Sequence, residues 1–292
     1  MAAIRRPIRQ GAVMRELTPD EREEIDRDAA LPQLDARRLI DETHLEGAIK
    51  AMYTEVAENP GGEFHFLTGR DLAEELGYDP GLLDRIPAEA ADSFAGVGHH
   101  FDLADLREGE TVVDLGSGSG TDLFCAAMLV GPSGHVIGID MTPAQLTKAA
   151  RLRDGAGLGN VELIESRIES VPLPDGIADC VVSNGVINLA PDKASVFAEA
   201  ARLLRPGGRL AIADIVSGRP LVGRTRRNTD LWAACIGGAI PRDAYLEAIE
   251  GVGLRVEEVR ENAYEFLTER ALNACDKYGV VSVSLIARRP AG

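Results

Sequence analysis

The segment from Thr111 to Gly120, which reads TVVDLGSGSG, constrains the fold of this chain more than any other. An apolar run carrying an acid is followed by three alternating glycines, Gly116, Gly118 and Gly120. Glycine accepts left-handed backbone and leaves no side chain over a turn, so the pattern predicts a buried strand, a tight turn and then a helix. Alone, such a turn is often only a tight connection. Together with the acids Asp114 and Asp140, it predicts a binding site for a flat, polar ligand.

The charges around the turn favour a cationic ligand. Asp114 precedes the first glycine, and no Lys or Arg occurs between Glu108 and Lys148. The dinucleotide fingerprint would set a pyrophosphate on the helix N-terminus and would need glycine at position 121, which is Thr121. An ammonium beside a sulfonium suits a carboxylate-flanked turn, and Asp140 at the next strand end can accept both hydroxyls of a ribose. Together these features indicate S-adenosylmethionine.

Strand and helix patterns alternate from residue 109 onward. Strands are expected at 111–115, 135–140, 161–166, 178–183, 209–214, 254–266 (broken by a loop helix) and 280–287. Helices are expected at 121–129, 143–153, 192–204 and 242–250, and the segment 217–228, with four arginines, is expected to be a mobile loop. The alternation predicts an α/β fold: a Rossmann-like, mostly parallel sheet with helices on both faces and its ligand at the strand carboxyl ends.

The first hundred residues are predicted to be a helical preface. Thr18 and Pro19 signal a helix start, and further helices are expected at 36–57, 68–76 and 79–86. We expect a flexible tail at 1–16, a helical extension or lid at 17–100, and the catalytic domain at 101–292. The tail is Arg-rich and acid-poor like a transit peptide, but it lacks the serines and apolar face of one, which favours a disordered or partner-held segment.

Composition limits the classes of partner. A net charge of −16 argues against nucleic acid, because phosphate contacts need clustered Lys and Arg. No apolar run reaches the length of a membrane span, and four widely spaced cysteines form no C-x-x-C pair. We expect a cytoplasmic enzyme with a small-molecule acceptor and no membrane partner, whose chemistry demands no metal; a homodimer stays open.

Several motifs resemble those of class I methyltransferases that use S-adenosylmethionine. They are VVDLGSGSG, GIDM, ESRIESVPLPDGIADCVVSN and LLRPGGRLAIADI. GIDMT at 138–142, SNGVINLAPDK at 183–193 and LWAACIGGA at 231–239 look like the arsenite methyltransferase branch. The likeness extends from about Tyr53 to the C-terminus. It implies a seven-stranded sheet whose last strand is antiparallel, covered at its ligand edge by the helical extension.

The resemblance also implies a set of donor-binding residues. They are Tyr53, Asp114, Gly116, Gly118, Gly120, Asp140, Met141, Ile168, Glu169 and Asn184. The glycines let the backbone approach the donor, Asp140 binds its ribose, and the pair at 168–169 meets its adenine. Asp114 acts on the ammonium through water or holds the turn. Asn184 faces the donor or bonds a loop, and Tyr53 contacts the donor or packs in the core.

The departures from the arsenite branch concern the acceptor. The resemblance implies that members of this branch bind trivalent arsenic with three cysteines. Of those three positions, only Cys235 is a cysteine in this chain. The loop before the first motif reads GVGHH, with Gly98, His99 and His100, and the strand-end position is Gly185. Soft thiolates suit a soft metalloid, so their loss disfavours arsenite.

His99 and His100 are candidates for deprotonating or orienting the acceptor. The alternative is that the two histidines are solvated or cap a helix. Cys235 is a candidate for touching the acceptor, against core packing. Three functions follow. The first is a methyltransferase acting on an O, N, S or C nucleophile of a small molecule. The second is an arsenite or metalloid methyltransferase, and the third is a donor-binding regulator without catalysis.

Overall fold

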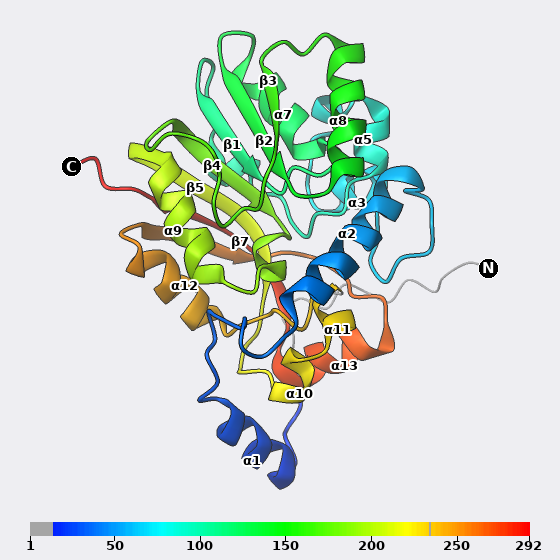
Figure 1. The fold of residues 1–292 in the computed structure, drawn as a ribbon, viewed down its shortest axis with the longest axis vertical. Helices are drawn as coiled ribbons and strands as arrows, with labels where there is room; N and C mark the ends of the chain where they lie inside the picture. The colour runs from blue at the N-terminus through cyan, green and yellow to red at the C-terminus, as the bar shows by residue number, and fades with distance from the viewer. Residues whose placement is uncertain (1–13, 234) are drawn as a thin grey trace.

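The computed structural model describes residues 14–233 and 235–292, and its centre is a seven-stranded sheet (Figure 1). The strand order is β3-β2-β1-β4-β5-β7-β6. The bounds are β1 Thr111–Leu115, β2 His135–Asp140, β3 Val161–Glu165, β4 Ala178–Asn184, β5 Leu204–Val216, β6 Arg255–Glu261 and β7 Val281–Arg288. Strand β7 runs antiparallel to both β5 and β6, and the remaining pairs are parallel. The predicted Rossmann-like sheet with an antiparallel last strand is confirmed.

Helices cover both faces of the sheet, as the alternating pattern predicts. They are α1 Pro19–Asp28, α2 Glu42–Glu58, α3 Arg70–Glu75, α4 Pro80–Leu83, α5 Ala88–Asp92, α6 Phe101–Ala104, α7 Thr121–Val130, α8 Pro143–Ala156, the 3-10 turn η1 Ile187–Leu189, α9 Lys193–Leu203, α10 Gly223–Arg226, α11 Thr229–Ala233, α12 Arg242–Gly251 and α13 Glu269–Tyr278. One face packs under α7 and α8, and the other under α9 and α12. Strands buried on both sides read as continuous apolar runs, which explains the VVDL and CVVS segments.

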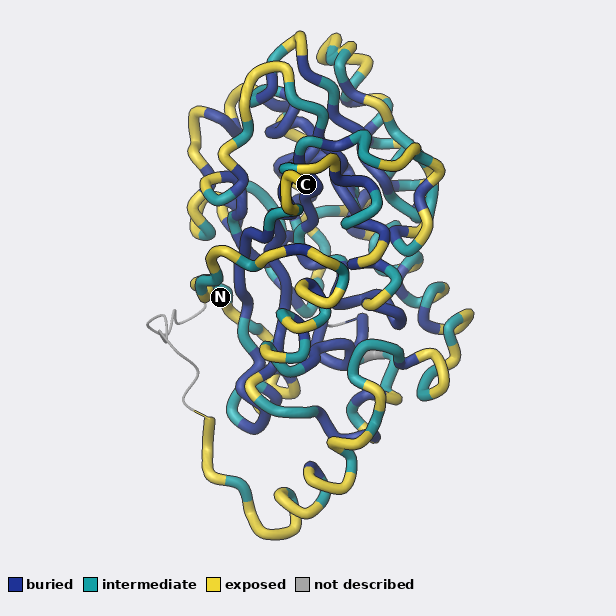
Figure 2. The backbone as a smooth tube through the Cα atoms, turned by 90° about the vertical axis from the view of Figure 1, so that its left-hand side faces the viewer, coloured by how far each residue is buried: buried dark blue, intermediate teal, exposed yellow. Residues whose placement is uncertain are grey.

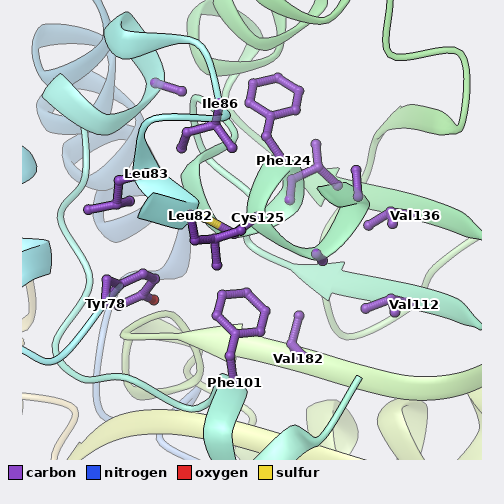
Figure 3. Close-up of a cluster of buried hydrophobic side chains, with 14 of the residues drawn as sticks. Tyr78, Leu82, Leu83, Ile86, Phe101, Val112, Phe124, Cys125, Val136 and Val182 are labelled. Atoms are coloured by element: carbon purple, nitrogen blue, oxygen red, sulfur yellow. The ribbon is translucent and has the colours of Figure 1, made fainter. Parts of the chain in front are cut away.

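Part of the helical extension shares its core with the sheet. Figure 3 shows Leu82, Leu83 and Ile86 of the extension beside Phe124 of α7, all within one buried cluster that also includes Val112 of β1. The segment before the predicted boundary at residue 100 therefore folds onto the catalytic domain. By contrast, α1 is largely exposed and lies at the far end of the molecule (Figure 2).

The start of one helix and the end of one strand differ from the prediction. Helix α2 begins at Glu42 instead of 36, because the Asp41 side chain caps it by accepting from His44 N at 3.0 Å. The preceding Ala36 donates instead to Pro191 O at 2.8 Å. Strand β6 ends at Glu261, and the helix after it is α13.

The arginine-rich segment 217–228 is built into the fold, contrary to the expected mobile loop. It contains α10, and the Arg226 side chain is only 1% exposed. Its Nη2 donates to Pro32 O at 2.6 Å, and its carbonyl accepts from Trp232 Nε1 at 2.6 Å. The composition of the segment indicates that it is polar, but it does not show that Arg226 binds a backbone carbonyl group far away in the sequence.

The predicted tail lies mostly outside the described residues, as do Arg5, Arg6 and Arg9. Its last part is held, since Arg15 N donates to Asp276 O at 2.8 Å and the Arg15 guanidinium pairs with Glu21 at 2.5 Å. Within residues 14–233 and 235–292, no helix combines the length and apolar character that crossing a membrane requires.

Candidate active site

A cavity is lined by residues at the carboxyl ends of β1, β2 and β4 and by residues of helix α2 of the extension. Predicted donor-binding residues that line it are Tyr53, Asp114, Gly116, Gly118, Asp140, Met141, Ile168, Glu169 and Asn184. Gly120 lies outside the lining. The structure thus brings together side chains that are up to 131 positions apart, from Tyr53 to Asn184.

The glycine turn is shaped by two different needs. Gly116 has φ +83°, and a Cβ there would lie 2.4 Å from Val186 Cγ2, so only glycine fits the approach to the opposite wall. Gly120, at φ +102°, begins α7, and a Cβ there would lie 2.6 Å from Phe124 Cε2. The first glycine therefore keeps the cavity open, whereas the last one packs the helix.

Asp140 is presented by backbone hydrogen bonds at the end of β2. Its Oδ2 accepts from Gly118 N at 2.9 Å, and its Oδ1 accepts from Thr142 N at 2.8 Å. Each carboxylate oxygen has more than one lone pair, so both keep acceptor capacity towards the cavity. Burial raises the pKa of Asp140. The carboxylate is fixed in place with free capacity for two hydroxyl donors.

Asp114 and Asp122 place two buried carboxyl groups beside the glycine turn. Asp114 is 2% exposed, and its Oδ2 has no hydrogen-bond partner among the described residues. Burial, followed by the neighbouring charges of Asp122 and Asp140, raises its pKa well above the usual value. An unpartnered buried acceptor is costly, and a bound cation would offset that cost.

Asp122 lines the cavity and Tyr78 is its buried partner, and the sequence did not single out either residue. The Tyr78 hydroxyl donates to Asp122 Oδ1 at 2.5 Å, and Asn184 Nδ2 donates to Asp122 Oδ2 at 3.0 Å. Asp122 lies in the first turn of α7, two positions after the last glycine, so its place in GSGSGTD was the signal available. Nothing in the local sequence indicated its partner on the extension.

Asn184 lines the cavity and also fixes the loop before β1. Its Oδ1 accepts from Val97 N at 2.8 Å, and its Nδ2 donates to Gly98 O at 2.9 Å. A Cβ on Gly96 would lie 2.5 Å from the same Nδ2. Of the two roles left open by the sequence, the loop hydrogen bond is present in the geometry.

Charged residues cross the mouth of the cavity. Arg167, after β3, pairs with Glu46 of α2 at 2.7 Å and with Glu169 at 3.1 Å. Both pairs are partly solvent-exposed. They link the extension to the segment that carries Ile168, which is itself 8% exposed and packed in the sheet core.

Helix α2 is docked on α8 through two side chains that the sequence analysis did not identify. Gln145 Nε2 donates to Tyr53 O at 2.9 Å, and Lys148 Nζ donates to Ala57 O at 2.9 Å. Gln145 also accepts from the Ser119 hydroxyl of the glycine turn. The turn and the extension are thus joined by one amide.

Neither His99 nor His100 is among the residues that line the cavity. His99 Nδ1 lies 3.4 Å from Asp102 and its ring lies edge-on to Tyr78, and burial lowers its pKa. His100 is fully buried, neither of its ring nitrogens has a hydrogen-bond partner in the described part of the chain, and burial lowers its pKa to about 3. A role of either histidine as the acceptor's base therefore stays a prediction.

Val97, in the same GVGHH loop, is the residue that faces the strand-end glycine. A Cβ on Gly185 would lie 3.2 Å from Val97 Cγ1, and Val97 shares a buried apolar cluster with Cys235 and Met141. Cys235 is 7% exposed, has φ +58°, and has its pKa raised to about 12 by burial. The cluster that contains Val97 and Met141 is therefore apolar, and the thiol of Cys235 within it is protonated.

Residues 106–270, more than half of the chain, match the family described as Methyltransferase domain. The sheet order and the glycine turn with its acidic strand end define the class I methyltransferase fold. The chain belongs to the methyltransferase domain family.

Two named relatives are arsenite methyltransferases. One, from Halobacterium salinarum, is 37% identical over 75% of this chain and 56% of its own length. The other, from Aquipseudomonas alcaligenes, is 44% identical over 54% of this chain and 47% of its own length. A solved arsenic(III) S-adenosylmethionine methyltransferase from Chlamydomonas reinhardtii is 35% identical, with a TM-score of 0.61 and 72% of each chain covered. The chain spans about half the length of these two curated relatives.

Proposed function

We propose that this chain transfers a methyl group from S-adenosylmethionine to a small organic acceptor at an O, N, S or C atom. The observation that carries the proposal is the unpartnered, buried Asp114 oxygen beneath a turn that only glycine can form, next to the fixed Asp140 carboxylate. A bound cation would stabilise a buried carboxylate, and a carboxylate with free lone pairs can accept hydrogen bonds from hydroxyl groups.

The residues present fit the donor. Gly116 and Gly118 let the backbone approach it, Asp140 accepts from its ribose hydroxyls, and Asp114 and Asp122 supply countercharge. When bound, S-adenosylmethionine supplies a methyl carbon activated by a sulfonium. The chain then has to hold the acceptor in line with that carbon and exclude water. Helix α2, with Tyr53, lines the cavity and would exclude water from it.

The charge of the cavity narrows the acceptor. Its lining carries the carboxylates Glu42, Glu46, Asp114, Asp122, Asp140 and Glu169. The single cation among the lining residues, Arg167, is engaged by two of them. With Asp114 and Asp122 facing the donor's positive charge, the remaining acids Glu42, Glu46 and Glu169 still outnumber Arg167, so we infer that the acceptor is neutral or cationic. The apolar lining from Leu45, Ile49 and Leu189 favours an organic body.

Arsenite is the second candidate, favoured by the names of the relatives and by Cys235. Against it, Val97 and Gly185 provide no thiol beside Cys235. Among the described residues, no three histidine, cysteine or acidic side chains are grouped as a metal ion would need. The trap implied by the resemblance is thus reduced to one thiol whose pKa is raised.

A panel assay separates the candidates. The full chain is incubated with S-adenosylmethionine and with phenols, amines, thiols, enolisable carbon acids, carboxylates or arsenite, and S-adenosylhomocysteine is quantified. We expect turnover with a neutral or cationic organic acceptor. Turnover restricted to arsenite would replace the proposal with the second candidate. Donor binding without turnover on the whole panel would favour a regulator.

A further inference from the structure

Lys193 lies behind the wall of the cavity formed by residues 186–191. We propose that Lys193 is a positioning residue for the methyl donor, because its buried ammonium fixes this wall against the glycine turn. The inference rests on the donor assigned under the proposed function.

The wall consists of residues that touch the cavity and the turn at once. Val186, Leu189, Ala190 and Pro191 line the cavity. Val186 packs so closely over Gly116 that a Cβ on the glycine would lie 2.4 Å away. A shift of the wall therefore changes the space above the glycine turn directly.

Lys193 holds the wall through its backbone carbonyls. Its Nζ donates to Asn188 O at 3.0 Å and to Ala190 O at 2.9 Å. The same Nζ lies 4.9 Å from the centroid of the Trp232 ring, and Lys193 is only 1% exposed. Single 3-10 turns leave carbonyls without helical partners, and here a charged donor satisfies them. An apolar side chain at this position would leave both carbonyls buried without that donor.

Charged groups from four segments of the chain act on Lys193. Asp214 of β5 and Arg226 of α10 are the largest influences, followed by Glu169 after β3 and Asp192 before α9. Asp214 is itself 1% exposed and accepts from the Tyr245 hydroxyl at 2.8 Å. Burial lowers the pKa of Lys193 and raises that of Asp214, while each charge favours the other.

This environment gives the wall a pH dependence of known sign. A lysine whose pKa is lowered loses its proton at a lower pH than an ordinary lysine, whose pKa is ~10.4. The neutral amine still donates, but without the charge assistance that makes such bonds strong. Donor affinity is therefore expected to fall as pH rises through the pKa of Lys193.

Calorimetric titration with S-adenosylmethionine tests the proposal on the full chain. We compare Lys193→Met with Lys277→Met. Lys277 is likewise buried, lies 5.2 Å from the Tyr278 ring and pairs with Glu21 at 3.3 Å, away from the cavity lining. At pH 6.5, we expect Lys193→Met to weaken donor binding at least tenfold and Lys277→Met less than twofold. The fall in affinity between pH 6.5 and 9 should flatten in Lys193→Met alone.

Equal donor affinity in Lys193→Met and the wild type would overturn the inference. Absence of donor binding in the wild type would instead overturn the proposed function. If Lys193→Met does not fold, Asp214→Asn decides: removing the countercharge lowers the pKa of Lys193 further, so the fall in affinity should move to lower pH. An unmoved midpoint contradicts the proposal.

Discussion

Replacing His100 by leucine tests whether the buried histidine is structural or catalytic. His100 is fully buried, and neither ring nitrogen has a hydrogen-bond partner among the described residues. Leucine has a similar volume and no polar atom. Because an unpaired buried polar group costs about 1–3 kcal/mol, we expect the variant to be as stable as the wild type at pH 7.5, or up to about 1 kcal/mol more stable after repacking.

The magnitude of the acid effect follows from the pKa. Burial lowers the pKa of His100 from 6.5 to about 3. Between these values the unfolded chain binds a proton that the native chain refuses, so stability is full above pH 6.5 and is lost as pH falls towards 3. One pKa unit corresponds to about 1.36 kcal/mol, which gives a loss of about 2 kcal/mol between pH 7.5 and pH 5.

Urea unfolding followed by the single tryptophan, Trp232, measures this loss, because its ring is 1% exposed in the native state. The advantage of His100→Leu over the wild type should grow by about 2 kcal/mol from pH 7.5 to pH 5. His44→Gln, which removes an exposed histidine, should show no such change. Parallel pH profiles for His100→Leu and the wild type would refute the reasoning. Loss of methyl transfer with donor binding intact would restore a catalytic role.

Three further predictions concern the donor site. Asp140→Asn removes a charged acceptor for two hydroxyls, so donor affinity in calorimetry should fall by about 1.5–3 kcal/mol; an unchanged affinity would remove Asp140 from the site. Gly116→Ala meets Val186 at φ +83° and should lower unfolding free energy by more than about 2 kcal/mol and abolish donor binding, whereas Gly157→Ala, at φ +66° in open space, should cost only about 1 kcal/mol. Arg167→Ala breaks partly exposed pairs, so stability should change by less than about 1 kcal/mol while stopped-flow shows faster donor release; unaltered release would mean that these pairs do not restrain the mouth.

The residues that we propose to bind the donor could be selected from the sequence because their signals are local. The glycine spacing, the acid before it and Asp140 twenty positions after the last glycine all lie within one strand-turn-helix-strand segment. Hydrophobic periodicity gave the sheet and its crossovers for the same reason, since each strand and helix is encoded over a few neighbouring residues.

The contacts of the GVGHH loop were not predictable, because residues far away in the sequence make them. Asn184 accepts from the amides of Val97 and Gly98, 87 and 86 positions away, and this fixes which residue of the GVGHH loop faces Gly185. The residue of this loop that packs against Gly185 is Val97 and not a histidine. The pairing of Tyr78 with Asp122 likewise spans 44 positions without a local signature.

Calorimetric titration of the full chain with S-adenosylmethionine, beside nicotinamide and flavin coenzymes, tests the central claim most directly. We predict saturable one-site binding of S-adenosylmethionine and no saturation by the other coenzymes. No heat with S-adenosylmethionine, together with clear saturation by a nicotinamide or flavin coenzyme, would contradict the account.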